Sequence, residues 1–156
     1  MRIRRVLNFI NLSTPAGLTL ALAGKCRISR GPDGLLLAGG WTWPLPRAAA
    51  FTVGNVILYR SRVASSFRPG HSGFQTGGFQ ASGFQASGPR TVRPDPSRLL
   101  RHESRHSTQY ALLGQAFLPL YFLAAGISAL RTGDPASGNI FERLAGLEDG
   151  GYRRPA

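Results

Sequence analysis

Two histidines four residues apart are the feature of this sequence best suited to chemistry. The segment reads His102-Glu103-Ser104-Arg105-His106. On a helix, such histidines lie one turn apart on one face, so both imidazoles can reach a single ion while Glu103 points into the same cleft. A zinc ion (Zn2+) held this way keeps one position for water. The motif therefore predicts one zinc ion bound by His102 and His106, with Glu103 as the catalytic base.

A third protein ligand must come from elsewhere in the chain, which holds only seven acidic residues. The candidates that follow the motif are Asp134, Glu142, Glu148 and Asp149. Asp134 precedes a proline in a predicted turn, and the last two adjoin a Gly-Gly pair. Glu142 lies on a predicted helix and is the most rigidly held of the four. We therefore predict Glu142 as the third metal ligand, which completes the two-histidine, one-glutamate set of hydrolytic zinc sites.

The residues around the motif predict the helix that it needs. Asp95-Pro96-Ser97 supplies the polar stop before a helix, and Gly114 a plausible end. A second helix is expected over 116–130. A short third helix is expected over 139–147, capped by Ser137 or Asn139.

The residues before the motif predict a small antiparallel sheet. Short apolar or alternating runs at 35–37, 41–43 and 51–59 are divided by turns rich in Gly and Pro. The run from Phe51 to Tyr59 is the best strand candidate because it is rich in β-branched and aromatic residues. Gly54-Asn55 within it indicates a bulge or a tight turn. The expected fold class is therefore α+β.

One domain with an internal insert is the expected organisation. Its parts are an apolar or helical N-terminal segment at 1–24, a β-rich part at 25–63, a flexible insert at 64–96, a helical part with the zinc site at 97–147 and a disordered tail at 148–156. The insert repeats Gly-Phe-Gln at 73–75, 78–80 and 83–85. So short a repeat, with little apolar surface, predicts a disordered loop expansion and not a stacked repeat fold.

The net charge of +12 raises nucleic acid as a partner. All nineteen basic residues except Lys25 are arginine, and they are spread along the chain. A coding sequence rich in G and C explains this bias without a ligand, so nucleic-acid binding is the less favoured alternative. Cys26 is the single cysteine, which excludes a disulfide within the chain.

Two apolar segments raise the question of a membrane. The run 111–130 carries no charge and, as a helix, would match the thickness of a bilayer core. Gly114 and Pro119 predict a break in it, so a core helix pair or a surface that leans on a membrane is favoured over a span. The basic start of the chain and Ala21-Leu22-Ala23 leave a cleaved secretion signal open. The expected location is cytoplasmic or membrane-associated.

The motif and its surroundings resemble the gluzincin group of zinc metallopeptidases. His102 to His106, then Gln109-Tyr110 and Asn139 to Ala145, are similar to small, largely uncharacterised members with an H-E-x-x-H-x-x-Q helix and a later Glu-x-x-Ala helix. The resemblance covers residues 48–63 and 97–147. It implies a zincin-like fold with the same three ligands and base, and a peptide or protein substrate lying along the strand 51–59 as an edge strand.

Three further residues are candidates for supporting roles. Gln109 follows His106 by one turn and is placed to hold a ligand or the helix. Tyr110 and Tyr121 could donate to a developing oxyanion, although tyrosines at helical spacing also pack in cores. The sequence thus predicts a zinc metallopeptidase, with a catalytically inactive or membrane-associated protein as the alternative. Arg105 departs from the family pattern, which has an uncharged residue there.

Overall fold

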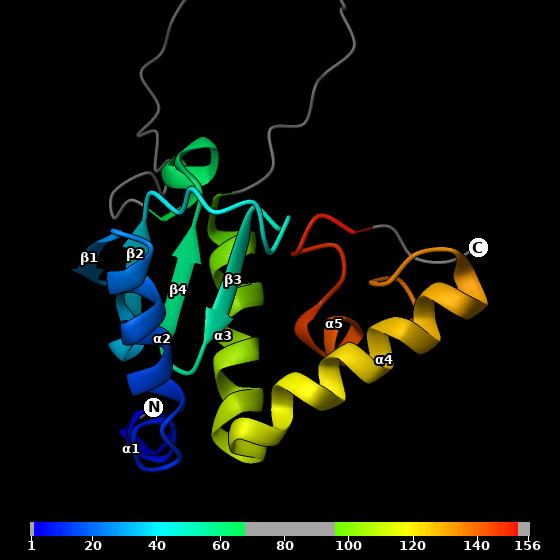
Figure 1. Ribbon diagram of the computed structural model, residues 1–156, viewed down its shortest axis with the longest axis horizontal. Helices are drawn as coiled ribbons and strands as arrows, with labels where there is room; N and C mark the ends of the chain where they lie inside the picture. The colour runs from blue at the N-terminus through cyan, green and yellow to red at the C-terminus, as the bar shows by residue number, and fades with distance from the viewer. Residues whose placement is uncertain (1, 68–95, 153–156) are drawn as a thin grey trace, which may run out of the picture.

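Helices surround a small sheet in the computed structural model of the chain, which describes residues 2–67 and 96–152 (Figure 1). The elements are α1 (Arg2–Ile10), α2 (Ser13–Ala23), β1 (Arg27–Arg30), η1 (Pro32–Gly34), β2 (Leu36–Gly39), β3 (Ala50–Val53), β4 (Val56–Tyr59), η2 (Ser61–Phe67), α3 (Pro96–Leu113), η3 (Gly114–Ala116), α4 (Phe117–Thr132) and α5 (Ile140–Ala145). The fold is therefore α+β, as expected. The three Gly-Phe-Gln repeats predicted to form a disordered insert lie outside the described residues.

The sheet is mixed, with strand order β1-β2-β4-β3. The prediction of an antiparallel sheet is wrong for one pairing, because β2 and β4 run parallel with Leu36 opposite Val56. The cause is that the run 51–59 is not one strand but a hairpin. It reverses the chain at Gly54-Asn55, so its second arm, and not its first, lies beside β2. The tight turn expected at this dipeptide is confirmed, and β3 becomes an edge strand.

The expected strand at 41–43 is also wrong, since these residues lie outside the sheet. Trp41 is buried instead, and its indole nitrogen donates to the Leu45 carbonyl at 3.2 Å. The nearby Pro44 and Pro46 have no N–H to donate to a neighbouring strand. The segment is therefore held by the packing of the Trp41 side chain and not by hydrogen bonds to a neighbouring strand.

Both faces of β4 are covered, which explains why this strand is apolar throughout. Val56 and Leu58 point into a cluster with residues of α2, Tyr110 and Phe117. Ile57 points the other way, into a cluster with Phe67 and residues of α3. Side chains alternate between the faces of a strand, so a strand covered on both sides has no polar face.

A buried polar network fixes the position of α3 against the sheet and α1. The Asn8 side-chain amide donates to Asn55 Oδ1 and to the Ser107 carbonyl, both at 2.9 Å. The Ser107 hydroxyl donates to the same Asn55 oxygen at 3.0 Å. All three residues are buried, and unpaired polar groups there would be costly, so one rotation of α3 is strongly favoured. That rotation turns the face carrying His102 and His106 inward.

The helices after the motif follow the expected order. Gly114, at φ +58, ends α3, and α4 follows after the short η3. Asn139 caps α5, its side-chain oxygen accepting from the Phe141 N–H at 3.0 Å. Among the described residues, one helical stretch, 97–132, is long and apolar enough to cross a membrane, and α1 and α2 together, bent by 75°, also reach that length and apolarity.

Gly54 provides a test of the hairpin turn. An added Cβ would lie 2.5 Å from the backbone of Ser13 and Thr14, and φ is +61. We expect Gly54→Ala to lower the free energy of unfolding by about 2–4 kcal/mol, through backbone strain and the clash. Gly126→Ala is the matched control, because its Cβ meets nothing within 4 Å. Equal stability of the two variants in urea melts would contradict this account of the turn.

Candidate metal centre

The polar face of α3 is its buried face. His102 and Glu103 are each 2% exposed and His106 is 7% exposed. An ordinary surface helix turns such residues to solvent and its apolar stripe to the core. Burial of charged and imidazole groups is costly unless each finds a partner, so the partners of these three side chains define the site.

Three ligand atoms converge at this face. The Nε2 atoms of His102 and His106 lie 3.1 Å apart. Glu142 Oε2, from α5, lies 3.1 Å from the first of these nitrogens and 3.6 Å from the second. Ligands at zinc-like bond lengths in a tetrahedron stand about 3.3 Å from one another. The three residues form a buried group able to hold a metal ion.

The partners of the two Nδ1 atoms set the tautomers of the imidazoles. His102 Nδ1 lies 3.1 Å from the Gly146 carbonyl oxygen, which can only accept. His106 Nδ1 lies 2.8 Å from Gln109 Oε1, and the Gln109 amide donates to the Phe141 carbonyl at 2.9 Å. Both Nδ1 atoms are therefore assigned the proton. Each Nε2 is left with its lone pair aimed at the site.

Glu142 is oriented by Tyr121 of α4, whose hydroxyl donates to Oε1 at 2.5 Å. Glu142 Oε2 faces the two Nε2 atoms, 3.1 Å from His102 and 3.6 Å from His106, and has no other polar partner among the described residues. Burial raises the pKa of Glu142, but contacts with both histidines outweigh this and leave the pKa below its usual value. Burial likewise lowers the pKa of His106, yet Glu142 reverses the sign and the net shift is upward. Both shifts favour a positive charge among the three ligand atoms.

Glu103 lies beside this group without belonging to it. The Thr52 hydroxyl, on the edge strand β3, donates to Glu103 Oε2 at 2.7 Å. Burial is the main reason that the pKa of Glu103 is raised, which makes it a better proton acceptor than an exposed carboxylate. The arrangement thus offers a cation site and an adjacent base.

The residues after α5 cover the site. Gly150 packs on His102 so closely that a Cβ there would lie 2.6 Å from the imidazole, and the Tyr152 ring centroid is 6.0 Å from that of His102. Arg105 donates to the Ala145 carbonyl at 2.7 Å and to Asp149 Oδ2 at 2.9 Å. The residue that departs from the family pattern therefore holds this cover in place. Residues 148–151, expected in a disordered tail, form turns here, and 153–156 of that tail lie outside the described residues.

The structure brings most of the predicted site residues together. His102, Glu103, His106, Gln109, Tyr121 and Glu142 all contact the centre. Tyr110 does not, since its ring packs on Phe117 at a centroid distance of 4.4 Å in the core. Sequence reasoning missed Thr52 and the Gly146 carbonyl. The strand pattern indicates that β3 lies near the motif, but it does not indicate which side chain faces Glu103.

Comparison with protein-family models, with curated sequences and with solved structures finds no match. The interpretation of this centre accordingly depends on its own geometry and on the motif.

Two buried tyrosines allow a matched test of ligand orientation. We expect Tyr121→Phe to weaken metal binding about 10- to 100-fold, because Glu142 loses the hydrogen bond that aims its free oxygen. Tyr110→Phe also removes a tyrosine hydroxyl, but one with no hydrogen-bond partner among the described residues, so the affinity for zinc should not change. Zinc titration against a competing chelator measures both. Equal affinities would show that Tyr121 does not orient Glu142.

Gly150 tests the packing of the cover on His102. Gly150→Ala places a methyl group against the imidazole, so either the ring or the segment must shift. We expect metal affinity to fall at least about 10-fold, since a shift of the ring misplaces Nε2. Gly126→Ala is again the control. An unaltered zinc affinity in the Gly150 variant would mean that the segment does not pack on His102.

Proposed function

We propose that this chain is a zinc-dependent metallopeptidase that hydrolyses bonds in a peptide or protein substrate. The observation that carries the proposal is the convergence of two imidazole lone pairs and one carboxylate oxygen beside a separate buried glutamate. A purely structural histidine–glutamate pair would not need a second buried glutamate held beside it by a hydroxyl.

The donor set favours zinc over other common ions. Magnesium and calcium prefer oxygen ligands, whereas two imidazoles with one carboxylate suit zinc. The measured separations, 3.1, 3.1 and 3.6 Å, agree with tetrahedral ligands. Three protein ligands are typical of hydrolytic zinc sites, since the fourth position remains for water.

The residues around the ion then have distinct tasks. A bound zinc ion supplies Lewis acidity and lowers the pKa of water at its open position. The Glu103 carboxylate accepts the proton of the attacking water and delivers it to the leaving nitrogen. Thr52 fixes the orientation of that carboxylate. Gln109 and Tyr121 hold His106 and Glu142, so their task is positioning.

The edge strand β3 supports a peptide as the substrate. It pairs with β4 on one side and is the last strand of the sheet. Thr52 in the middle of β3 contacts Glu103, so an extended peptide added to this edge would pass close to the base. Strand addition of this kind satisfies the peptide backbone without demanding a particular sequence.

A second candidate function is a metal-binding protein without hydrolytic activity. The observation that favours it is the cover over the site, with His102 and Glu142 each only 2% exposed. Metal content alone does not separate the two candidates. A variant of Glu103 separates them, because this residue has a task only in hydrolysis.

Metal analysis of purified variants tests the proposal. We expect one zinc ion per chain in the unmutated protein, and less than about a tenth of that in His102→Ala, His106→Ala and Glu142→Ala. Glu103→Gln should keep the metal and lower kcat/KM on a peptide substrate at least about 100-fold. Asp33→Asn, a carboxylate remote from the site, is the control. Near-zero zinc in the unmutated protein would exclude the site, and a fully active Glu103→Gln would exclude its role.

A further inference from the structure

Helix α1 turns Arg4 and Asn8 inward and leaves its apolar residues exposed. Asn8 is fully buried, and Arg4 reaches inward to donate to the Ser104 hydroxyl at 2.9 Å. On the outer side, Ile3 is 75% exposed, Phe9 62% and Ile10 71%. A helix on the surface of a protein in water normally buries its apolar side chains against the core. The outer face of α1 therefore suits an apolar environment.

Helix α4 shows the same inversion. Ser128 is 1% exposed, accepts from the Gly138 N–H at 2.8 Å and donates to the Asp134 carbonyl at 2.6 Å. Phe122, at 65%, and Leu130, at 90%, lie on the outside. Helices α1 and α4 are far apart in the sequence, yet both expose apolar side chains on their outer sides. This indicates that the same environment covers both helices.

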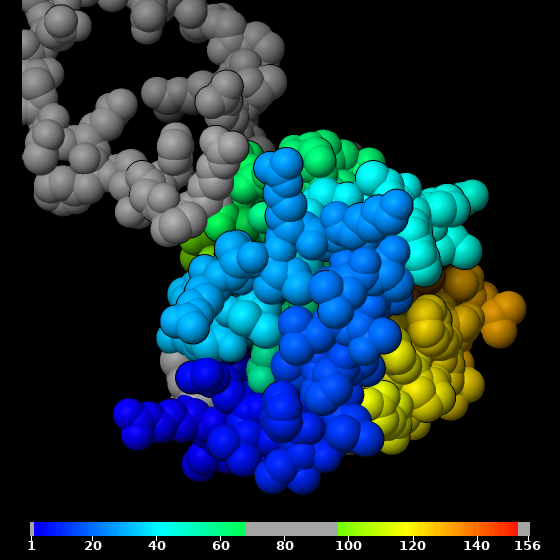
Figure 2. Space-filling view, turned by 60° about the vertical axis from the view of Figure 1, so that its left-hand side comes forward, coloured from blue at the N-terminus to red at the C-terminus, as the bar shows by residue number. Residues whose placement is uncertain are grey.

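The two helices meet through the turn between α1 and α2. The Asn11 amide donates to the Tyr110 carbonyl at 2.9 Å, and Gln115 donates to the Asn11 carbonyl at 3.2 Å. Leu12 in this turn is 62% exposed, and Leu112 at the end of α3 is 77% exposed. Figure 1 shows α1 and the bend between α3 and α4 at the same end of the molecule, and Figure 2 shows α1, α2 and α4 adjoining. We call the exposed apolar side chains of α1, this turn, the end of α3 and α4 the apolar face.

Charge identifies what covers this face. Residues 1–32 and 104–133 contain no acidic residue, whereas α1 carries the exposed Arg2 and Arg5. A broad apolar surface bordered by cations matches the boundary of an anionic bilayer, where apolar side chains enter the acyl region and arginines meet phosphates. We propose that the apolar face docks on a membrane surface that contains anionic lipid.

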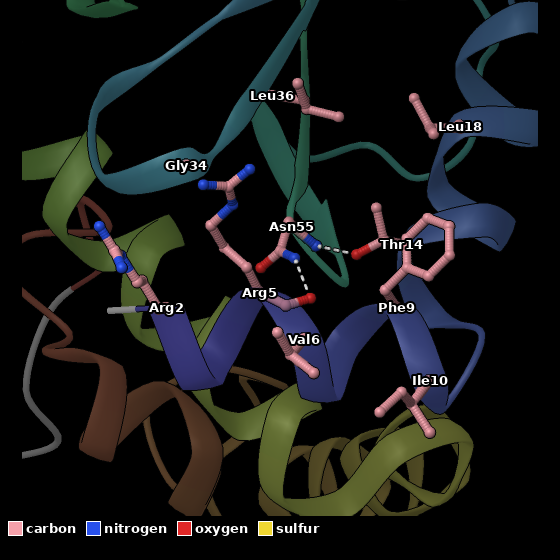
Figure 3. Close-up of a pocket in the computed structure, with 10 residues that line it drawn as sticks. All are labelled: Arg2, Arg5, Val6, Phe9, Ile10, Thr14, Leu18, Gly34, Leu36 and Asn55. Atoms are coloured by element: carbon pink, nitrogen blue, oxygen red, sulfur yellow. Dashed lines mark hydrogen bonds between the residues drawn. The ribbon is translucent and has the colours of Figure 1, made fainter.

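A pocket beside α1 supports a preference for anionic lipid. It has a volume of about 620 Å³ and lies between α1, α2 and β2 (Figure 3). Apolar side chains such as Val6, Phe9 and Leu36 line it together with Arg2 and Arg5. An apolar cavity with two guanidinium groups fits the glycerol and upper acyl region of a lipid whose phosphate group is negatively charged.

The face lies on the membrane and does not cross it. Helix α4 has 16 residues, about 24 Å at 1.5 Å per residue, which is shorter than a bilayer core of about 30 Å. The other half of the long helical stretch is α3, which carries the metal centre and is bonded to the sheet and α5. Docking through the outer sides of α1 and α4 leaves this half outside the acyl region.

Vesicle flotation of the full chain tests the proposal and requires neither metal nor activity, so its failure is separate from failure of the proposed function. We expect binding at least about 10-fold tighter to phosphatidylcholine vesicles containing roughly one-third phosphatidylglycerol than to phosphatidylcholine alone. The triple variant Ile10→Gln, Leu112→Gln, Leu130→Gln should lose at least about 10-fold in binding to the anionic vesicles. The three side chains are 71, 77 and 90% exposed, and thermal melts check that the variant folds.

Two further variants make the result specific. The double variant Ile28→Gln, Leu45→Gln changes exposed apolar residues outside the apolar face and should bind as the unmutated protein does. The double variant Arg2→Gln, Arg5→Gln should lose the preference for anionic vesicles.

Four outcomes would overturn the proposal. The first is no vesicle binding by the unmutated protein, and the second is equal loss in the triple variant and the Ile28, Leu45 control. The third is normal binding by the triple variant together with loss of vesicle binding by the unmutated protein in high salt, which would mean adsorption by charge alone. The fourth is a stable dimer that the triple variant dissociates, with no vesicle binding, which would mean that a second copy covers the face.

Discussion

The crowding of three electron-rich atoms at one buried point is the constraint on which this structure depends. Two imidazole nitrogens and a carboxylate oxygen approach within 3.1 to 3.6 Å, and none of the three can turn away. Gly146, Gln109 and Tyr121 occupy the opposite atoms of the ligands. A positive charge at this point, either a proton or a metal ion, relieves the repulsion among these atoms, and the surrounding hydrogen bonds aim all three at it.

The rest of the fold supplies the orientation that this constraint needs. The hairpin places Asn55 where it bonds both α1 and α3, and the bonded Ser107 directly follows His106. Polar groups thus occupy the interior next to α3, and apolar side chains are displaced to the outside of α1 and α4. The apolar face on the outside and the polar centre inside therefore both follow from the placement of polar side chains in the interior.

Local patterns predicted the centre better than the sheet. The helix around His102 and His106 follows from spacing, and Glu142 follows from the rigidity of a short capped helix. Strand direction depends on which hairpin arm meets β2, a long-range choice that no local pattern records. The carbonyl of Gly146 and the hydroxyl of Thr52 were beyond prediction, because the partner of a buried polar atom is set by packing.

The bond between Arg105 and Asp149 has a kinetic consequence. It joins α3 to the segment after α5, which packs over His102. A metal ion at the proposed site would therefore exchange with solvent more slowly while this segment stays in place over His102. A slow exchange of this kind would keep the ion in place even where free zinc is scarce.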